Sequence, residues 1–189
     1  MTRLVLMGPP GCGKGTQGAL LSAMLGVPHV STGEMLRSEI ASGSKLGVLA
    51  GSLIDRGEFV PDDVITGIVL GVLSRDAARG GYILDGYPRT LPQARVVLEH
   101  GAADAVVAIA VPDEALAARV AARASAGRAD DTPETFATRM RIYRERTAPV
   151  TDLFREAGLL VEVDGTAPPE AVAAAILRAT QAEPEPATR

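Results

Sequence analysis

Cysteine is almost absent from the chain, because Cys12 is the only one in 189 residues. A single thiol excludes an intrachain disulfide, and it excludes a metal site built from four cysteines. Chains without disulfides are typical of reducing compartments, so we expect a cytoplasmic protein.

Long apolar runs and an excess of positive charge are missing as well. The apolar segments 64–73 and 105–111 are far shorter than the roughly 20 residues that a membrane-spanning helix requires. The first residues read as a strand, without the charged and apolar regions of a secretory signal. The formal net charge of −4 disfavours binding to nucleic acid. We therefore expect neither a membrane nor a nucleic acid among the partners.

A glycine-rich segment follows the apolar run 4–7 directly. Residues 8–17 read Gly-Pro-Pro-Gly-Cys-Gly-Lys-Gly-Thr-Gln. A buried strand that breaks into such a turn and then opens a helix is typical of a phosphate-binding loop, because backbone N–H groups and the helix N-terminus converge on one anion. Lys14 adds a mobile positive charge. A glycine-rich turn with an incidental lysine is the alternative, and the flanking strand and helix patterns disfavour it.

The segment departs from the general G-x-x-x-x-G-K-[ST] motif at one position. Gly8, Gly13 and Lys14 fit the motif, but Gly15 stands where the hydroxyl is expected and the hydroxyl follows at Thr16. This shift argues against Mg²⁺ binding directly to a loop hydroxyl. We expect Thr16 to contact a phosphate oxygen, with the metal held through water or by another carboxylate.

Short apolar runs alternate with helical patterns along the chain. Strands are expected at 3–7, 28–31, 81–84, 105–111 and 159–163. Helices are expected at 15–25, 33–42, 45–55, 62–73, 91–100, 113–123, 133–156 and 168–180. Strands separated by helices predict an α/β fold, in which a five-stranded parallel sheet is covered on both faces and binds ligands at the carboxyl ends of its strands.

Two segments do not fit this alternation and suggest mobile parts. Residues 32–63 hold two or three helices between consecutive elements of the core, and 124–131 form a small polar loop. We expect a substrate-binding flap and a lid here, although the alternative is that both segments are ordinary surface elements without a role in binding. The expected organisation is a single domain at 1–180 (core 1–31, 61–123 and 132–180; insertion 32–60; lid 124–131) followed by a disordered tail at 181–189.

Arginines gather at the predicted strand ends and loop edges. Arg37 and Arg89 follow strands, while Arg119 and Arg123 are four apart and share one helix face. Arg128 and Arg139 flank the acidic pair 130–131 and could instead form a surface ion-pair network with it. Singly, an arginine is more typical of solvated surface. Together and beside a phosphate loop they predict phosphate binding, because guanidinium groups bind phosphate oxygens bidentately.

These segments together resemble the adenylate kinase family over nearly the whole chain. The family's phosphate loop G-x-P-G-x-G-K-G-T-Q is matched at 8–17, including the displaced threonine. Its S-T-G-[DE]-x-x-R, D-G-[FY]-P-R-[ST]…Q, G-R-x-D-D and V-D-G-T segments are matched at 31–37, 85–93, 127–131 and 163–166.

The resemblance implies a P-loop kinase of three layers that catalyses MgATP + AMP ⇌ 2 ADP. It implies an ATP site at Gly11, Cys12, Gly13, Lys14, Gly15, Thr16, Arg119, Arg123 and Ala167. It implies an AMP site at Thr32, Arg37, Glu58, Phe59, Val60, Gly86, Tyr87, Pro88, Arg89, Gln93, Arg128 and Arg139. The implied catalytic residues are Lys14, Arg89, Arg123, Arg128 and Arg139.

The resemblance also implies a magnesium ion and a monomer. Asp85 is the implied partner of Mg²⁺ through water. The lid has the short form, without the insertion that carries zinc-binding cysteines in many bacterial members, so no zinc is expected. Transfer between two nucleotide oxygens needs in-line positioning and charge neutralisation rather than a general base, because the phosphate of AMP is already ionised near neutral pH.

Three other functions share part of this pattern. A kinase for UMP or CMP would share the fold and most of the arginines, but Gln93 and Thr32 favour adenine because an amide can pair with both donor and acceptor on its edge. A shikimate- or gluconate-type kinase would lack the 85–93 segment. A nucleotide-dependent switch protein would leave a second phosphate-binding constellation unexplained.

Overall fold

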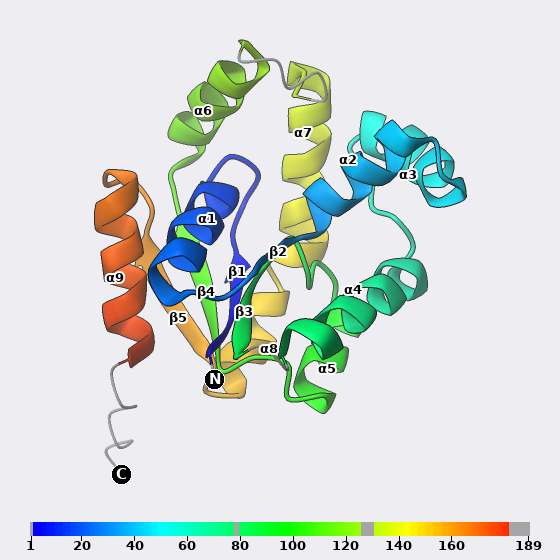
Figure 1. The fold of residues 1–189 in the computed structure, drawn as a ribbon. Coiled ribbons are helices and arrows are strands. Elements are labelled where there is room, and N and C mark those ends of the chain that lie inside the picture. Colours follow the sequence, from blue (N-terminus) through cyan, green and yellow to red (C-terminus); the bar gives the residue numbers. More distant parts are fainter. Residues whose placement is uncertain (1, 78–79, 126–130, 182–189) are drawn as a thin grey trace.

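A computed structural model of the protein describes residues 2–77, 80–125 and 131–181. Arg128 and the tail 182–189 lie outside these residues, as does most of the 124–131 segment. The described strands form one five-stranded sheet in the order β2-β3-β1-β4-β5, and every neighbouring pair is parallel (Figure 1). The strands are β1 (Thr2–Met7), β2 (His29–Ser31), β3 (Gly81–Asp85), β4 (Ala105–Ala110) and β5 (Leu160–Asp164). The expected α/β fold with a five-stranded parallel sheet is confirmed.

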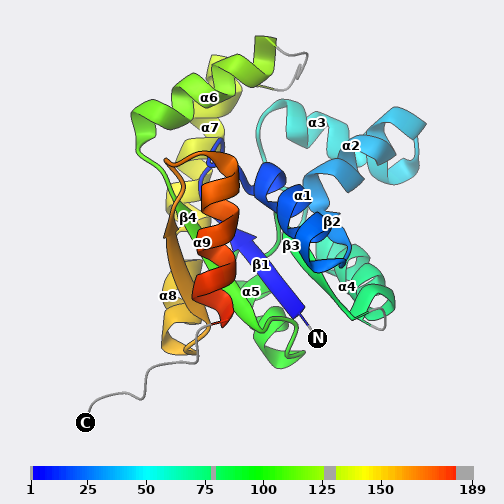
Figure 2. The same ribbon diagram turned by 60° about the vertical axis from the view of Figure 1, so that its left-hand side comes forward.

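Helices connect the strands and extend beyond the sheet. They are α1 (Lys14–Leu25), α2 (Thr32–Ser42), α3 (Lys45–Asp55), α4 (Asp62–Ala77), α5 (Leu91–Glu99), α6 (Asp113–Ser125), α7 (Pro133–Ile142), α8 (Val150–Glu156) and α9 (Pro169–Gln181). Figure 2 shows α2 and α3 standing away from the sheet on the side of β2, and α6 at the opposite side of the same end. In the part of the chain that has been placed, no helix combines the length and apolar character needed to span a membrane.

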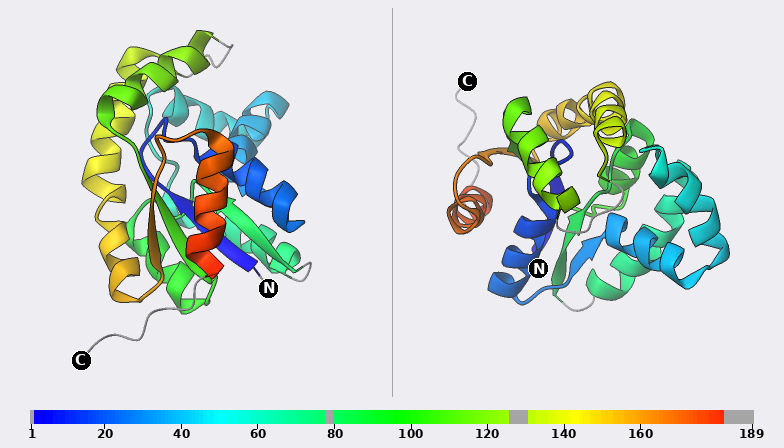
Figure 3. Two further views of the ribbon diagram at one scale, coloured as in Figure 1. Left: turned by 90° about the vertical axis from the view of Figure 1, so that its left-hand side faces the viewer. Right: turned by 90° about the horizontal axis from the view of Figure 1, so that it is seen from above.

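The sheet is buried on both faces, because alternate residues of a strand point to opposite sides. On β1, Val5 and Met7 pack into one apolar core with residues of α4, α5 and α8. Leu4 and Leu6 pack into a second core with residues of α1, α6 and α9. The result is the expected three layers, with helices on both sides of the sheet (Figure 3).

The helix expected over residues 133–156 is wrong as a single element. It is divided into α7, a π-helical turn at Tyr143–Thr147, and α8. The N–H of Ala148 donates to the carbonyl of Tyr143 at 2.8 Å, a wider spacing than in an α-helix. Pro149 follows and has no N–H to continue an α-helical ladder, so the chain re-starts as α8.

Side chains cap the helices that leave the strands and loops near the site. Ser31 accepts from the N–H of Glu34 at the start of α2, and Thr90 accepts from that of Gln93 at the start of α5. Thr132 accepts from the N–H of Thr135 at the start of α7. Such caps satisfy N–H groups that have no partner within the helix, which fixes where each helix begins. Among these three helices, α2 starts directly at the end of a strand, β2, at the carboxyl edge of the sheet.

Candidate active site

A cavity of about 730 Å³ lies at the carboxyl edge of the sheet. It extends from the loop after β1 to α2 and to the segment between α3 and α4. It is lined by all nine residues of the expected ATP site: Gly11, Cys12, Gly13, Lys14, Gly15, Thr16, Arg119, Arg123 and Ala167. From the expected AMP site it is lined by Thr32, Arg37, Glu58, Phe59, Val60, Gly86, Pro88, Arg89, Gln93 and Arg139.

Tyr87 is the described residue of the expected AMP site that does not line this cavity. Its ring is buried in the core beneath the site. Its hydroxyl lies 3.1 Å from Oγ1 of Thr66 and donates to the carbonyl of Gln93 at 3.4 Å. Burial raises the pKa of this phenol above its ordinary value, with a smaller opposing effect of Thr66. The side chain of Tyr87 therefore supports the start of α5 from below.

The loop after β1 depends on glycine. Gly8, Gly11 and Gly13 have φ angles of 143°, 91° and 103°, a region that side-chain-bearing residues rarely adopt. A Cβ on Gly8 would also lie 2.7 Å from the carbonyl oxygen of Ile109. Gly13 is the N-cap of α1 and has no side chain to accept from the first N–H groups of that helix. Among the described residues, these N–H groups face the loop without a side-chain cap. This arrangement suits an anion bound by backbone donors.

The ammonium of Lys14 lies across this loop. Its Nζ donates to the carbonyl of Gly8 at 2.8 Å and to that of Pro9 at 3.0 Å, and it lies 3.5 Å from Sγ of Cys12. Cys12 is buried, with 2% of its surface exposed. The small residues of the loop therefore surround a single positive charge, and carbonyl oxygens hold it where a phosphate could bind.

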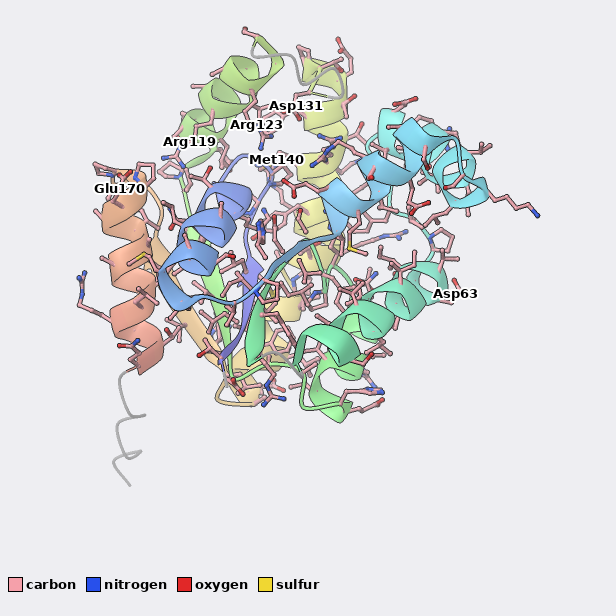
Figure 4. All side chains as sticks on the ribbon, viewed as in Figure 1. Asp63, Arg119, Arg123, Asp131, Met140 and Glu170 are labelled. Carbon is pink, nitrogen blue, oxygen red and sulfur yellow. The ribbon has the colours of Figure 1, made fainter. Side chains whose placement is uncertain are left out.

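Two arginines from different helices meet at one buried carboxylate. Nη1 of Arg139, on α7, donates to Oδ1 of Asp131 at 2.8 Å. Nε of Arg123, on α6, lies 3.1 Å from Oδ2 of the same side chain. The side chain of Asp131 is only 1% exposed, so two guanidinium groups balance a carboxylate that has lost its water. Arg123 and Asp131 are labelled in Figure 4. The contact of Arg139 with Asp131 matches the alternative of an ion-pair network with the acidic segment, but this pair is buried instead of lying at the surface. Asp130 lies outside the described residues.

Arg119 links two loops on the side of the cavity where the ATP site is expected. Its guanidinium donates to the carbonyl of Gly165 at 2.9 Å and to that of Cys12 at 3.3 Å. Gly165 begins the loop between β5 and α9, and Ala167 follows in that loop. Arg119 and Ala167 thus both line the cavity beside the loop after β1.

On the opposite side, Arg89 is held by its own loop and by an aromatic ring. Its Nε donates to the carbonyl of Gly86 at 2.7 Å, and its guanidinium lies 5.2 Å from the ring centre of Phe59. Its backbone carbonyl accepts from Oγ1 of Thr147 at 2.9 Å. Thr147 comes from the π-helical turn, so the irregular segment that the sequence reasoning missed positions a residue of the expected AMP site.

Gln93 is buried beneath Arg89 with 3% of its surface exposed. Its Oε1 accepts from the backbone N–H of Arg89 at 2.7 Å, and its Nε2 donates to Oδ1 of Asp62 at 2.6 Å. The other oxygen of Asp62 accepts from Oγ1 of Thr90 at 2.8 Å. Sequence reasoning missed Asp62, because an acidic residue in the first turn of a helix is most simply explained by the helix dipole.

Asp85 lies at the end of β3, between the two halves of the cavity. Its carboxylate is buried and lies next to the first turn of α1, since a Cβ on Gly15 would be 3.9 Å from Oδ2. Ser31 donates to Oδ2 at 3.5 Å, and Nε2 of His29 lies 3.9 Å from it. A single hard oxygen donor beside a phosphate loop fits Mg²⁺, which keeps several waters and takes further ligands from phosphates. Among the described residues no three acidic, histidine or cysteine side chains cluster as a protein-only metal site.

The parallel sheet and this cavity define a nucleotide-binding protein of the P-loop class. Comparison with known proteins is more specific. The family model for adenylate kinase matches residues 6–159. An adenylate kinase of Methylobacterium nodulans is 45% identical over 186 residues, covering 92% of this chain and 94% of its own.

Two further relatives show the same match. An adenylate kinase of Stenotrophomonas maltophilia strain K279a is 45% identical over 186 residues, covering 95% of this chain and 100% of its own. One from Xylella fastidiosa strain 9a5c is 44% identical over 170 residues, covering 86% and 90%. The chain belongs to the adenylate kinase family, and is thus a nucleoside monophosphate kinase. Membership supports phosphoryl transfer from ATP to AMP as its function.

Proposed function

We propose that this chain transfers the terminal phosphoryl group of ATP to AMP in the cavity at the carboxyl edge of the sheet, and that the reaction is reversible. The observation that carries the proposal is that positively charged side chains line the cavity on both sides of Asp85, in two separate groups. One group lies at the loop with Lys14, and the other contains Arg37 and Arg89. A protein that binds a single nucleotide needs one such group, whereas a transfer between two nucleotides needs both.

On the donor side, the proposed ATP site uses the phosphate loop and the loop after β5. Backbone N–H groups of Gly11, Gly13 and Gly15 and the hydroxyl of Thr16 bind the phosphates, as suits the open N-terminus of α1. The Lys14 ammonium exchanges its carbonyl partners for phosphate oxygens and follows the transferred group. Arg119 and the backbone near Ala167 flank the adenine.

On the acceptor side, the proposed AMP site lies between α2 and the start of α5. Arg37 and Arg89 hold the phosphate of AMP, and the backbone of 58–60 together with Thr32, Gly86 and Gln93 surrounds the nucleoside. Guanidinium groups suit this role because they stay charged when water is excluded. Pro88 and Phe59 line the wall of the pocket.

Charge that spreads over the transferred group is neutralised from the side of α6 and α7. Arg123 and Arg139 provide this stabilisation, oriented by Asp131, and Arg128 is proposed to join them although it lies outside the described residues. Asp85 would hold a magnesium ion through water, and the ion would supply further neutralisation of charge on the phosphates. No side chain needs to act as a general base.

Two segments are proposed to close over the nucleotides and exclude water as a competing acceptor: the insertion at 32–60 and the short lid at 124–131. The protein is proposed to act as a cytoplasmic monomer on ATP, AMP and ADP, which returns AMP to the nucleotide pool. Partners beyond these nucleotides are not needed.

The test is the ATP-dependent conversion of AMP to ADP by the purified protein with and without Mg²⁺, with Lys14→Ala as the control for a contaminating kinase. Formation of ADP that requires Mg²⁺ and is lost in the variant supports the proposal. A panel of AMP, CMP and UMP as acceptors separates it from a pyrimidine nucleotide kinase, which would prefer CMP or UMP.

A further inference from the structure

Asp62 connects the first turn of α4 to the first turn of α5. Both of its carboxylate oxygens accept hydrogen bonds from α5: Oδ1 from Nε2 of Gln93 at 2.6 Å, and Oδ2 from Oγ1 of Thr90 at 2.8 Å. Thr90 is also the N-cap of that helix. Asp62 itself does not line the cavity, but Gln93 does. The carboxylate of Asp62 therefore contacts a residue of the pocket wall, Gln93, without lining the pocket itself.

The partners of Gln93 require one orientation of its amide. A carboxylate can only accept, so it requires the NH₂ group, and a backbone N–H can only donate, so it requires Oε1. Asp62 meets the first requirement and the N–H of Arg89, at 2.7 Å from Oε1, meets the second. A flipped amide would place oxygen against a carboxylate and NH₂ against N–H in a side chain that is 3% exposed. Burial makes such unpaired polar groups costly.

This fixed amide has one N–H and one oxygen lone pair remaining for a ligand. That pair is complementary to a base edge with a ring nitrogen acceptor next to an exocyclic amino group, as in adenine and cytosine. It is mismatched to an edge with a ring N–H next to a carbonyl, as in hypoxanthine, guanine and uracil.

We propose that Asp62 is a positioning residue that fixes the polarity of the Gln93 amide, and through it selects amino-type over oxo-type bases at the acceptor site. The inference rests on the proposed placement of the AMP base beside Gln93. It adds the class of acceptor that the site takes: nucleoside monophosphates whose base presents an amino group beside an unprotonated ring nitrogen.

Inosine monophosphate is the sharpest probe, because it has the shape of AMP with the polarity of this edge reversed. The measurement is the ratio of kcat/KM for AMP to that for inosine monophosphate, with CMP and UMP as a second matched pair. In Asp62→Asn the new amide can either donate or accept, so one of the two restraints on Gln93 is lost. We expect the ratio to fall by about tenfold or more, mainly through KM.

Asp63→Asn is the matched control. Asp63 lies on the same helix turn, and its removal changes the charge near the N-terminus of α4 equally, but its side chain is exposed (Figure 4). The ratio should be unchanged in this variant. If Asp62→Asn does not yield a folded protein, Asp62→Ala removes the same restraint, and its ratio should fall in the same direction.

The variant Gln93→Leu and the double variant Asp62→Asn/Gln93→Leu separate the possible failures. If Asp62 acts through Gln93, the double variant has the same ratio as Gln93→Leu alone. If Gln93→Leu lowers the ratio and Asp62→Asn leaves it unchanged, the role of Asp62 is overturned while the proposed AMP site stands. An unchanged ratio in Gln93→Leu overturns both the base contact and the inference, and turnover of ATP with AMP by the parent enzyme still reports on the reaction itself.

Discussion

Nη1 of Arg139 donates a 2.8 Å hydrogen bond to Oδ1 of Asp131, a carboxylate whose side chain is 1% exposed. Nε of Arg123 lies 3.1 Å from the other oxygen of this carboxylate. Two arginines from α6 and α7 that we propose to contact phosphates are thus oriented by one acidic residue. Preorganised charge of this kind stabilises a transition state without the cost of ordering it during the reaction.

We predict that Asp131→Ala lowers both stability and kcat. Two partly buried guanidinium groups lose a partner, so the free energy of unfolding should fall by about 1–3 kcal/mol in urea titration. The matched control is Glu145→Gln, which breaks the exposed pair of Glu145 with Arg141 at 3.1 Å. That change should cost less than about 0.5 kcal/mol. Equal effects in the two variants would contradict an orienting role for Asp131.

Lys14→Ala is expected to lower kcat by roughly 10²–10³-fold or more, corresponding to about 3–4 kcal/mol of lost transition-state stabilisation. Lys14→Arg should also be poor, because a planar guanidinium cannot follow a moving phosphoryl group as a compact ammonium does. Steady-state kinetics beside thermal unfolding test this, and the midpoint of unfolding should change little. Retention of more than a tenth of the parent kcat in Lys14→Ala would exclude the proposed role.

Arg123→Ala and Arg139→Ala are expected to lower kcat and kcat/KM together by roughly 10–100-fold, with a smaller change in nucleotide affinity. The reason is that their charges act most strongly when negative charge spreads in the transition state. Steady-state kinetics and the binding of a bisubstrate nucleotide analogue separate the two effects, and Arg128→Ala belongs in the same series. Near-normal kcat in all three would mean that these arginines stabilise the structure alone.

Gln93→Leu is expected to raise the KM for AMP and to narrow the preference for AMP over UMP, with little change in the KM for ATP. A site whose buried polar groups are left unpaired by the wrong base rejects that base strongly, and leucine removes those groups. The acceptor panel measures this directly. An unaltered preference would show that the amide only makes hydrogen bonds to Arg89 and Asp62 and does not contact the base.

Burial raises the pKa of Tyr82 to about 12, an effect that exceeds the smaller influences of Arg3 and Asp104. Above the ordinary value of 10 the unfolded chain loses this proton while the folded chain keeps it, so stability falls as the pH rises from about 10 to 12. Tyr82→Phe should lose this part of the pH dependence, about 3 kcal/mol over the whole range, although it also loses the 2.6 Å hydrogen bond to the carbonyl of Ala102. Urea unfolding of both proteins between pH 9 and 11 measures how steeply the free energy of unfolding falls with pH in each of them.

Local patterns in the sequence predicted most of the fold. The strand and helix alternation, the loop at 8–17 and the cap at Thr132 depend on neighbouring residues, and the structure shows each of them. The five strands were placed within two residues of their observed bounds. The division of 133–156 was missed, because no residue type marks the wider hydrogen-bond spacing of the π-helical turn and because Pro149 was included in one continuous helix.

Sequence by itself determined the residue types of the site: glycines where the loop needs positive φ, a lysine within it, and arginines beside the predicted strand ends. The tertiary structure decided which other groups these site residues contact and how they are oriented. Asp62 reaches Gln93 across 31 positions, and Arg119 reaches Gly165 across 46. Packing also buried Tyr87 and placed Asp131 between α6 and α7. Such contacts depend on how distant helices pack against one sheet, and no local spacing encodes that distance.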